Sequence, residues 1–396
     1  MRNKPRIRFK GFTEDWEQRK LDDIAKIKTG GGTPKTANPE YWSGNIPWIQ
    51  SSDLVEGDIV HVNINKFINN NALKNSAAKL ISRDSIALVT RVGVGKVAVI
   101  NQDFTTSQDF LSLSDFDGND IKFLAYQLYR LMQENAKVLQ GTSIKGITKT
   151  ELIEQSISIP SSGQEQNLIS NVLSKIDSFI TFHQRKLEKL KLAKKALLQK
   201  LFPKNGSKFP ELRFKGFADA WEQRKLGEFV KIVSGDAPST FISGNCVYVK
   251  VDDLNHSDRI QLSSSNLVNA NPKAHLVNQG ATIFPKRGAA IMTNKVRIMG
   301  KDGYLDTNMM ALIPEEIDKD FLFTFIQKTG LYKIADTSTI PQINNKHIEP
   351  YMIQVPSEKE QAYIGVVFKK IDKIITLHQQ EPFLCENSVN DGVELC

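Results

Sequence analysis

Residues 164–202 read QEQNLISNVLSKIDSFITFHQRKLEKLKLAKKALLQKLF, and this stretch predicts how the whole chain is organised. Apolar residues recur in it at alternating steps of four and three, the heptad pattern of a coiled coil. Ser162 and Glu165 have the spacing of a capping box at the helix start, and Pro203 should end the helix. About 39 residues at 1.5 Å each give a rod of about 58 Å. Such a rod needs a partner along its seam and should hold apart the domains fused to its ends.

Composition favours a protein of the reducing cytoplasm. The 396 residues carry a net charge of +8 and a pI near 9.1, and they can form two or three domains. No apolar run of about 20 residues predicts a membrane span, and the N-terminus lacks the apolar segment of a signal peptide. The three cysteines have neither zinc-site nor disulfide-framework spacing. We therefore expect a cytoplasmic protein without a metal site.

Positive charge is concentrated in the second half of the predicted helix. Residues 183–204 contain eight Lys or Arg and one acidic residue, Glu188. Such a run is typical of a solvated coiled-coil face, and equally of a surface that meets nucleic acid. The pattern alone leaves both interpretations open.

The chain contains an internal repeat. Residues 5–21 read PRIRFKGFTEDWEQRKL and residues 210–226 read PELRFKGFADAWEQRKL, with 12 of the 17 positions identical. Further matches pair 48–54 with 248–254, 143–160 with 339–356, and 165–184 with 360–379. The ends of the two copies match while their middles differ, which indicates a shared frame with two separately tuned centres.

Each copy has the pattern of a mixed domain. We predict a β-hairpin at 84–100 with a counterpart at 280–298, and helices at 121–139 and 321–334, while the Asn- and Ser-rich segments 63–76 and 263–271 suggest loops. The predicted class is α+β, with two tandem pseudo-symmetric domains joined by a long coiled-coil-forming helix and a shortened second helix near the C-terminus. The predicted boundaries are 1–160, 161–203, 204–355, 356–380 and 381–396, the last being a divergent tail.

A search for catalytic motifs finds none that is convincing. The run Gly30 to Thr36 is glycine-rich, but it lacks the spacing of a phosphate-binding loop and is more typical of a turn. Asn38 to Tyr41 resembles the Asn-Pro-Pro-Tyr motif of adenine methyltransferases. Glu40 replaces the second proline, however, and no glycine-rich cofactor motif precedes it, so we interpret it as a loop. The six histidines are not grouped with acids or cysteines at ligand spacing.

These features together resemble the specificity subunit of type I restriction–modification systems. The motifs that carry the resemblance are Gly31-Gly32-Thr33-Pro34, Asn38-Pro39-Glu40-Tyr41-Trp42, Ile46-Pro47-Trp48, and the repeated domain ending before Glu165-Gln166 and Glu360-Gln361. Two copies in tandem, joined by a heptad helix, make the match specific, and it covers about residues 5 to 380.

The resemblance implies a non-catalytic DNA-recognition subunit with two target-recognition domains, each reading one half of a split site in double-stranded DNA. It implies that the two long helices pack antiparallel as a spacer, whose length sets the gap between half-sites. It also implies two methyltransferase subunits, which methylate adenine N6 with S-adenosylmethionine, and ATP-dependent translocating endonuclease subunits. Two alternatives remain: a methyltransferase or nuclease with built-in recognition domains, and a DNA-binding adaptor outside restriction. Missing cofactor motifs count against the first.

Base recognition requires Arg, Lys, Asn or Gln on loops that reach a DNA groove. The candidates in the first domain are Lys35, Arg91, Lys96, Gln108 and Lys145. Those in the second domain are Lys250, Lys286, Arg287, Asn308, Gln342 and Asn344. Each could instead be an ordinary solvated side chain or a phosphate contact without sequence information.

The expected helix seams are defined by the heptad positions. In the central helix these are Ile169, Leu173, Ile176, Ile180, His183, Leu187, Leu190, Lys194, Leu197 and Leu201, and in the second helix Ile364, Phe368, Ile371 and Ile375. After Gln379 the two copies diverge. Pro382 falls at the position of Leu187 and is expected to end the second helix there, which would leave the far part of the central helix without a partner.

Overall fold

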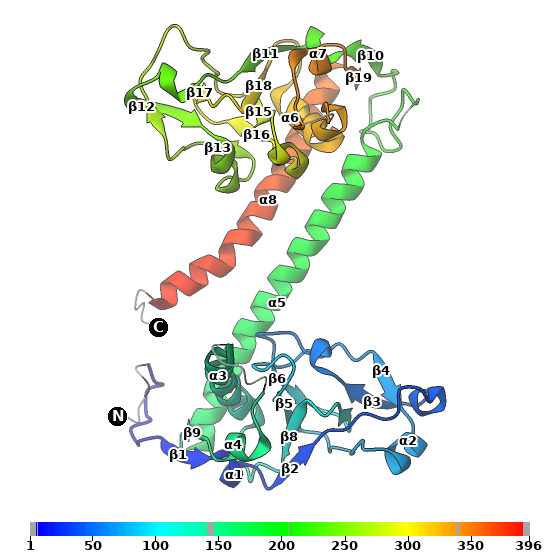
Figure 1. Ribbon diagram of the computed structural model, residues 1–396, viewed down its shortest axis with the longest axis vertical. Coiled ribbons are helices and arrows are strands. Elements are labelled where there is room, and N and C mark those ends of the chain that lie inside the picture. Colours follow the sequence, from blue (N-terminus) through cyan, green and yellow to red (C-terminus); the bar gives the residue numbers. More distant parts are fainter. Residues whose placement is uncertain (1–4, 6, 141–145, 205, 338–339, 391–396) are drawn as a thin grey trace. The chain divides into compact units, whose positions relative to one another are not determined.

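The structure of the protein is a computed structural model that describes residues 5, 7–140, 146–204, 206–337 and 340–390 (Figure 1). The chain divides into two compact units, residues 1–180 and 181–396. Each unit contains strands and helices, as an α+β fold requires. The predicted central helix is present as α5 (Gly163–Lys200), whose first part belongs to the first unit and whose remainder belongs to the second.

The first unit is built on an antiparallel sheet of four strands in the order β2-β8-β5-β6. These strands are β2 (Ile27–Gly30), β5 (Ser85–Val89), β6 (Val97–Ile100) and β8 (Phe110–Ser114). The pairing of β5 with β6 confirms the predicted hairpin, and Gly93 and Gly95 have positive φ in its turn. Helix α3 (Ile121–Gln140) confirms the predicted helix and buries Phe123 and Leu128 against the sheet.

A smaller sheet lies beside it, with strand order β4-β3-β7. Its strands are β3 (Ile46–Ile49), β4 (Lys66–Ile68) and β7 (Thr105–Thr106). The prediction of a loop at 63–76 is therefore wrong, because this segment contains β4 and helix α2 (Asn70–Asn75). Asn69, which composition assigned to a loop, caps α2 by accepting a hydrogen bond from the backbone N–H of Ala72.

The second unit repeats this plan. Its larger sheet has the order β11-β18-β15-β16-β13, and its smaller one β14-β12-β17. The strands are β11 (Val230–Ser234), β12 (Ser243–Val249), β13 (Ile260–Gln261), β14 (Leu267–Val268), β15 (Thr282–Pro285), β16 (Arg297–Met299), β17 (Gly303–Leu305) and β18 (Met309–Pro314). The hairpin predicted at 280–298 is confirmed by β15 and β16. The loop predicted at 263–271 is wrong in part, since it contains β14.

The helix predicted at 321–334 ends earlier than expected. Helix α6 spans Lys319–Thr329 and stops at Gly330, whose φ of 70° places it in the left-handed region. A short 3-10 turn, η7 (Leu331–Ile334), follows. A glycine in this conformation is a common way to end an α-helix, so the single helix predicted over 321–334 is two elements.

The repeated ends of each copy meet in space. Strand β1 (Glu17–Lys20) pairs with β9 (Ser156–Ile159), and β10 (Glu222–Lys225) pairs with β19 (Met352–Val355). Three short helices lie near these ends: α1 (Leu21–Ile24), α4 (Lys149–Ile153) and α7 (Asn345–Ile348). The frame that the repeat predicted is therefore a closed one, in which the beginning of each copy binds the segment just before its long helix.

A buried carboxylate joins each N-terminal repeat to the start of a long helix. Glu165 is 1% exposed, and its two oxygens accept hydrogen bonds from Arg8 at 2.6 and 2.8 Å. Glu360 in helix α8 (Glu358–Asn390) accepts the same two bonds from Arg213, at 2.8 and 2.7 Å. The predicted capping box forms only in part, because the backbone N–H of Glu165 reaches Ser162 while the carboxylate is taken by arginine. A bidentate charge-assisted pair is stronger than a cap contact.

The neighbouring glutamine repeats a second contact. The side-chain amide of Gln166 donates to the carbonyl of Pro160, and its oxygen accepts from the backbone of Asp120. Gln361 makes the equivalent bonds to Pro356 and Asp318. The repeated Glu-Gln pair is therefore a structural clasp at the start of each long helix.

Helices α5 and α8 run antiparallel within the second unit. His183 lies against His378, with their Nδ1 atoms 3.1 Å apart, and Lys194 forms an ion pair of 2.7 Å with Asp372. The direction follows from the two pairs together, because the step forward along α5 from His183 to Lys194 is a step back along α8 from His378 to Asp372. The prediction that Pro382 ends the second helix is wrong, because α8 continues to Asn390. A proline removes one backbone hydrogen bond but does not stop a helix from continuing. With 33 residues, α8 is still shorter than α5, which has 38.

Several of the predicted seam residues pack against the domain cores. Leu201, Ile364 and Phe368 are buried in the core of the second unit, with Leu197 and Ile371 packed against it. Ile169 packs against the core of the first unit. Ile176, however, is 45% exposed, so its assignment to a buried seam is wrong. A strict heptad drifts around a straight helix of 3.6 residues per turn, so not every seam position faces the same neighbour.

An ion network in the second unit connects its strands to both long helices. Arg259 is 8% exposed and binds Asp320 of α6 at 2.8 Å and Asp372 of α8. Asp372 also binds Lys194 of α5, and Lys369 lies 3.5 Å from Asp320. The position equivalent to Arg259 in the first unit is Ile59. The Ile59 carbonyl accepts a hydrogen bond from strand β6, as the Arg259 carbonyl does from strand β16. This connection is therefore specific to the second unit.

The network predicts a large stability effect at Arg259. Replacing it, as in Arg259→Met, leaves two poorly solvated carboxylates short of positive partners and should lower the free energy of unfolding by about 3–5 kcal/mol. Urea denaturation monitored by circular dichroism measures this. The control is Lys204→Met, which removes an exposed ion pair with Glu211 and should cost less than about 1 kcal/mol. Equal effects of the two substitutions would contradict the assigned role of Arg259.

Candidate nucleic-acid interface

A backbone clamp fixes the end of the central hairpin strand in the first unit. The N–H of Thr90 donates to the carbonyl of Asp109 at 2.7 Å, and the N–H of Ile147 donates to the carbonyl of Thr90 at 2.8 Å. Thr90 is thereby held between two other segments. Arg91 follows it directly and is exposed. The arginine therefore leaves the sheet from a rigid point rather than from a free loop.

The second unit has the same clamp with different side chains. The N–H of Lys286 donates to the carbonyl of Asn308 at 2.7 Å, and the N–H of Ile343 donates to the carbonyl of Lys286 at 2.8 Å. Arg287 follows and is exposed, as Arg91 is. The two arginines therefore occupy corresponding positions of the two units.

A cavity of about 550 Å³ adjoins the first clamp. Arg91, Gln108 and Lys149 contribute to its lining, and the Gln108 side-chain oxygen accepts a hydrogen bond from the Thr33 hydroxyl. Lys149 was missed in the sequence, since it lies at the start of the short helix α4 and no motif marks it. Its ammonium donates to the Lys28 carbonyl at 3.3 Å, and Lys149 shares the cavity lining with Arg91.

The second clamp concentrates positive charge. Lys286 is half-buried, and burial together with the adjacent Arg287 guanidinium lowers the pKa of the Lys286 ammonium. A nearby phosphate would oppose both effects by stabilising the charged form. Keeping Lys286 charged beside Arg287 costs free energy, and an anionic ligand bound there would offset that cost.

The glycine-rich run is a close-packed turn. A Cβ on Gly31 would lie 2.0 Å from the carbonyl oxygen of Ser107, and one on Gly32 would lie 2.0 Å from that of Ala77. The Gly32 carbonyl also accepts a hydrogen bond of 3.1 Å from Trp48 Nε1. These glycines are therefore needed where backbones approach each other, as expected for a turn rather than a phosphate-binding loop.

The Asn-Pro-Glu-Tyr motif forms a local turn. Residues Pro39–Trp42 make the 3-10 helix η1, and the side-chain oxygen of Asn38 accepts from the backbone N–H of Glu40 at 3.2 Å. The asparagine thus caps its own turn, and the segment interpreted as a loop is a short capped helix.

Several predicted contact residues have internal partners. The Lys96 ammonium donates to the carbonyls of Ser51 and Leu54 at 3.0 and 2.8 Å, which gives it a structural role. Asn308 donates to the Asp306 carboxylate. Asn344 is the N-cap residue of α7, and its backbone N–H donates to His347 Nδ1 at 3.1 Å.

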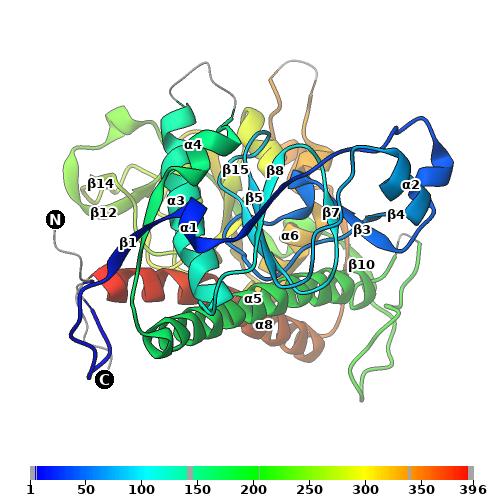
Figure 2. The same ribbon diagram turned by 90° about the horizontal axis from the view of Figure 1, so that it is seen from below.

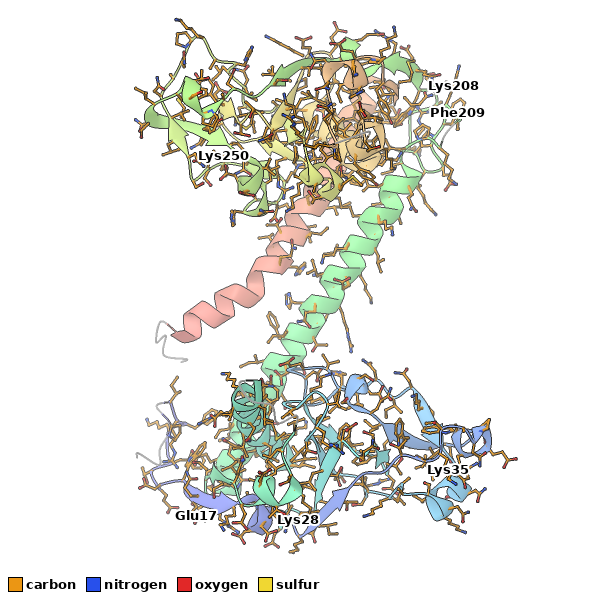
Figure 3. All side chains as sticks on the ribbon, viewed as in Figure 1. Glu17, Lys28, Lys35, Lys208, Phe209 and Lys250 are labelled. Atoms are coloured by element: carbon orange, nitrogen blue, oxygen red, sulfur yellow. The ribbon has the colours of Figure 1, made fainter. Side chains whose placement is uncertain are left out.

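The remaining predicted residues are distributed as follows. Gln342 is half-buried and pairs through its backbone with Asp336, while Lys35 is exposed on the turn before η1. Lys250 is fixed by Asn266 at 2.9 Å. Lys145 lies outside the described residues. Figure 3 shows Lys35 and Lys250 on the outer parts of their respective units.

The described part of the chain has neither a candidate metal cluster nor a membrane-spanning helix. No group of three or more His, Cys, Asp or Glu residues there could hold a metal ion. None of the helices found there is long and apolar enough to cross a membrane.

Comparison with known proteins gives a family match for both units. The family model for the type I restriction modification DNA specificity domain matches residues 13–192 and, separately, residues 218–384. The two matches together cover well over half of the chain, and each contains one clamp, one clasp and most of one long helix.

Individual relatives agree with this match. The specificity subunit of the type I restriction enzyme MjaIX from Methanocaldococcus jannaschii is 29% identical over 395 residues, covering 93% of this chain and 89% of the relative. That of MjaVIII from the same organism is 25% identical over 390 residues, with 93% and 88% covered. The crystal structure of a type I restriction-modification system S subunit from M. genitalium has the same fold, with a TM-score of 0.62 at 18% identity, covering 93% of this chain and 92% of that one.

The packed glycine turn gives a prediction with an adjacent control. Gly32→Ala should lower the free energy of unfolding by about 1–3 kcal/mol, because the added methyl meets a backbone carbonyl that cannot rotate away. Gly30→Ala meets nothing within 4 Å and should change it by less than about 0.5 kcal/mol. Thermal or urea denaturation distinguishes the two variants. A Gly32→Ala protein as stable as Gly30→Ala would show that the turn is not close-packed.

Proposed function

The chain belongs to the type I restriction–modification DNA specificity family, and from this premise we propose that each of its two units reads one half of a split site in double-stranded DNA. The observation that carries the proposal is the duplicated clamp, which presents an exposed arginine from the same point of each sheet. The surrounding side chains differ between the two units. One frame with two sets of side chains is what recognition of two different half-sites requires.

The chemistry of the clamps suits the major groove. An arginine can donate two hydrogen bonds to O6 and N7 of guanine, the commonest specific contact of proteins with DNA. Arg91 shares its cavity with Gln108 and Lys149, and Arg287 directly follows Lys286. In this proposal the arginines and Gln108 read base edges, while the lysines bind phosphates and hold the register.

Catalysis belongs to the partner subunits. As a specificity subunit the chain supplies recognition, and the methyltransferase and endonuclease activities reside elsewhere in the complex. We propose that two methyltransferase subunits bring S-adenosylmethionine and that endonuclease subunits bring ATP. The length of α5 is proposed to set the gap between the half-sites.

The long helices offer a surface for such partners. Phe182 on α5 is 59% exposed and Leu377, its equivalent on α8, is 50% exposed. Large apolar side chains on one exposed helical face are typical of interaction sites. Because the two residues occupy equivalent positions of the repeat, they fit two copies of one partner, bound once to each helix.

The central experiment is mapping of adenine methylation. The chain is co-expressed with its methyltransferase partner, and the host DNA is sequenced for N6-methyladenine. Methylation of a motif in two parts with a fixed unspecified gap is expected. A complex that forms and methylates a continuous motif, or none, would refute the split-site proposal.

The two arginines should control separate halves of that motif. Arg91→Gln is expected to relax the half read by the first unit, and Arg287→Gln the half read by the second. Each should lose about 1–3 kcal/mol of discrimination, because one bidentate contact is removed. Methylation mapping of each variant measures this. Loss of both halves in either variant would show that the arginines do not act separately.

Partner binding should depend on the exposed helix residues. The double variant Phe182→Ser, Leu377→Ser is expected to weaken methyltransferase binding by at least about tenfold, because apolar area leaves the interface. Analytical ultracentrifugation gives the stoichiometry. Val138→Ser is the control, since Val138 is 69% exposed but lies on α3. Unchanged assembly of the double variant would place the partner elsewhere.

A further inference from the structure

The smaller sheet of the first unit holds a lysine over two tryptophans. Lys66 of β4 lies opposite Trp48 of β3, and its Nζ is 5.4 Å from the Trp48 ring centroid and 5.9 Å from that of Trp42. The two rings pack edge to face at 5.0 Å. Nζ also donates to the side-chain oxygen of Gln50 at 3.3 Å. One ammonium is thus positioned by aromatic faces and one amide oxygen.

The second unit makes the same arrangement with the residues exchanged. Tyr248 of β12 takes the place of Trp48, and the ammonium comes from Lys250, 5.8 Å from the Tyr248 centroid. Lys250 Nζ donates to the side-chain oxygen of Asn266 at 2.9 Å. Asn266 lies opposite Tyr248, where its carbonyl accepts the Tyr248 N–H at 3.0 Å.

The exchange keeps one cation and one amide at equivalent positions. Gln50 corresponds to Lys250 and Lys66 to Asn266, both at a separation of 200 residues. The lysine and the amide have therefore changed places across the strand pair, while the aromatic residue between them has stayed. A pair that only joined two strands would need no lysine. Retention of the charge at this place indicates that the charge itself is used.

The ammonium groups are available to a ligand. Neither Lys66 nor Lys250 forms an ion pair with any residue that the structure describes. The carboxylates of the same turn have other donors: Asp53 accepts from the backbone of Gln50 at 2.9 Å, and Asp253 from that of Lys250 at 2.8 Å. An ammonium has three donors, and the amide uses only one.

The surroundings favour an anion. Residues 63–80, which contain β4 and α2, include three lysines and no acidic residue. Lys35 is close as well, since its carbonyl accepts a hydrogen bond from Trp42 Nε1 at 3.4 Å. Figure 2 shows β3, β4 and α2 together at one end of the first unit, beyond its larger sheet.

We propose that Lys66 in the first unit and Lys250 in the second each bind one DNA backbone phosphate, at equivalent places of the two half-sites. This rests on the proposed function and adds to it a pair of phosphate sites on the smaller sheets, apart from the arginines of the clamps. The aromatic ring and the amide limit the freedom of the ammonium before DNA binds, which reduces the entropic cost of the contact. A phosphate contact fixes register and carries no sequence information.

The test measures DNA binding by the complete complex with its methyltransferase subunits. The probe is a labelled duplex carrying the mapped motif, titrated at several salt concentrations. Lys66→Gln and Lys250→Gln should each weaken binding by about tenfold at low salt, as expected for one charge-assisted hydrogen bond. Each should reduce the slope of log K against log salt by about 0.9, and the double variant by about twice that. The methylated motif should keep its bases.

The exchange supplies the matched control. Gln50→Lys combined with Lys66→Gln copies the arrangement of the second unit, and Lys250→Gln combined with Asn266→Lys copies that of the first. Both should restore the affinity and the salt slope. Melting temperatures of all variants establish that folding is intact.

Three results would overturn the proposal. The first is an unchanged salt slope in Lys66→Gln and Lys250→Gln while the complex still binds the motif. The second is a folded exchange variant that stays as weak as the single variants, which would assign the effect to geometry rather than charge. The third is an unaltered complex that binds no split site, which would refute the proposed function together with this inference.

Discussion

Burial of a carboxylate at the start of each long helix is the constraint on which the rest of the structure depends. Glu165 and Glu360 are both 1% exposed, and a charge so placed is tolerable only with an excellent partner. Arg8 and Arg213 provide it through two parallel hydrogen bonds each. The chain must therefore return its N-terminal repeat to the helix, which closes each domain around a variable centre.

Closure of the frame explains how two centres can differ without loss of the fold. The hydrogen bonds that the two clamps share, at Thr90 and Lys286, join backbone groups and place no demand on the side chains. The first clamp adds one side-chain bond, from the Thr90 hydroxyl to the Asp109 carbonyl at 3.0 Å. The cross-strand lysine and amide could exchange places for the same reason, because the strands pair through their backbones. Backbone hydrogen bonds thus set the positions of these residues, and their side chains can differ between the two units.

The sequence predicted those parts of the fold that local pattern controls. The hairpins, α3 and α5 follow from periodicity, and the two-unit frame follows from the repeat. Strand β4 and helix α2 were missed because their stability comes from pairing with β3 and from a cap at Asn69, neither of which composition reveals. The prediction that Pro382 ends the second long helix was wrong because the unfavourable helix preference of one residue is outweighed by the rest of the helix.

The candidate site was harder to predict than the fold, since it depends on contacts between distant segments. Lys96 had the residue type and the loop position of a DNA contact, yet its ammonium is committed to two carbonyls. Lys149 and Lys66 lacked any motif, and their places depend on contacts with distant residues, Lys28 for the first and Trp48 for the second.

The same helix position illustrates this dependence on the centre. Asp177 on α5 accepts a hydrogen bond from Tyr126, and burial raises the pKa of its carboxyl group. Its equivalent on α8, Asp372, binds Arg259 and Lys194 instead. The aspartate is present in both copies of the repeat, but its partner is a tyrosine hydroxyl in the first unit and an arginine and a lysine in the second. A sequence motif therefore identifies the frame, whereas the role of a residue in it follows from the partner that the fold brings to it.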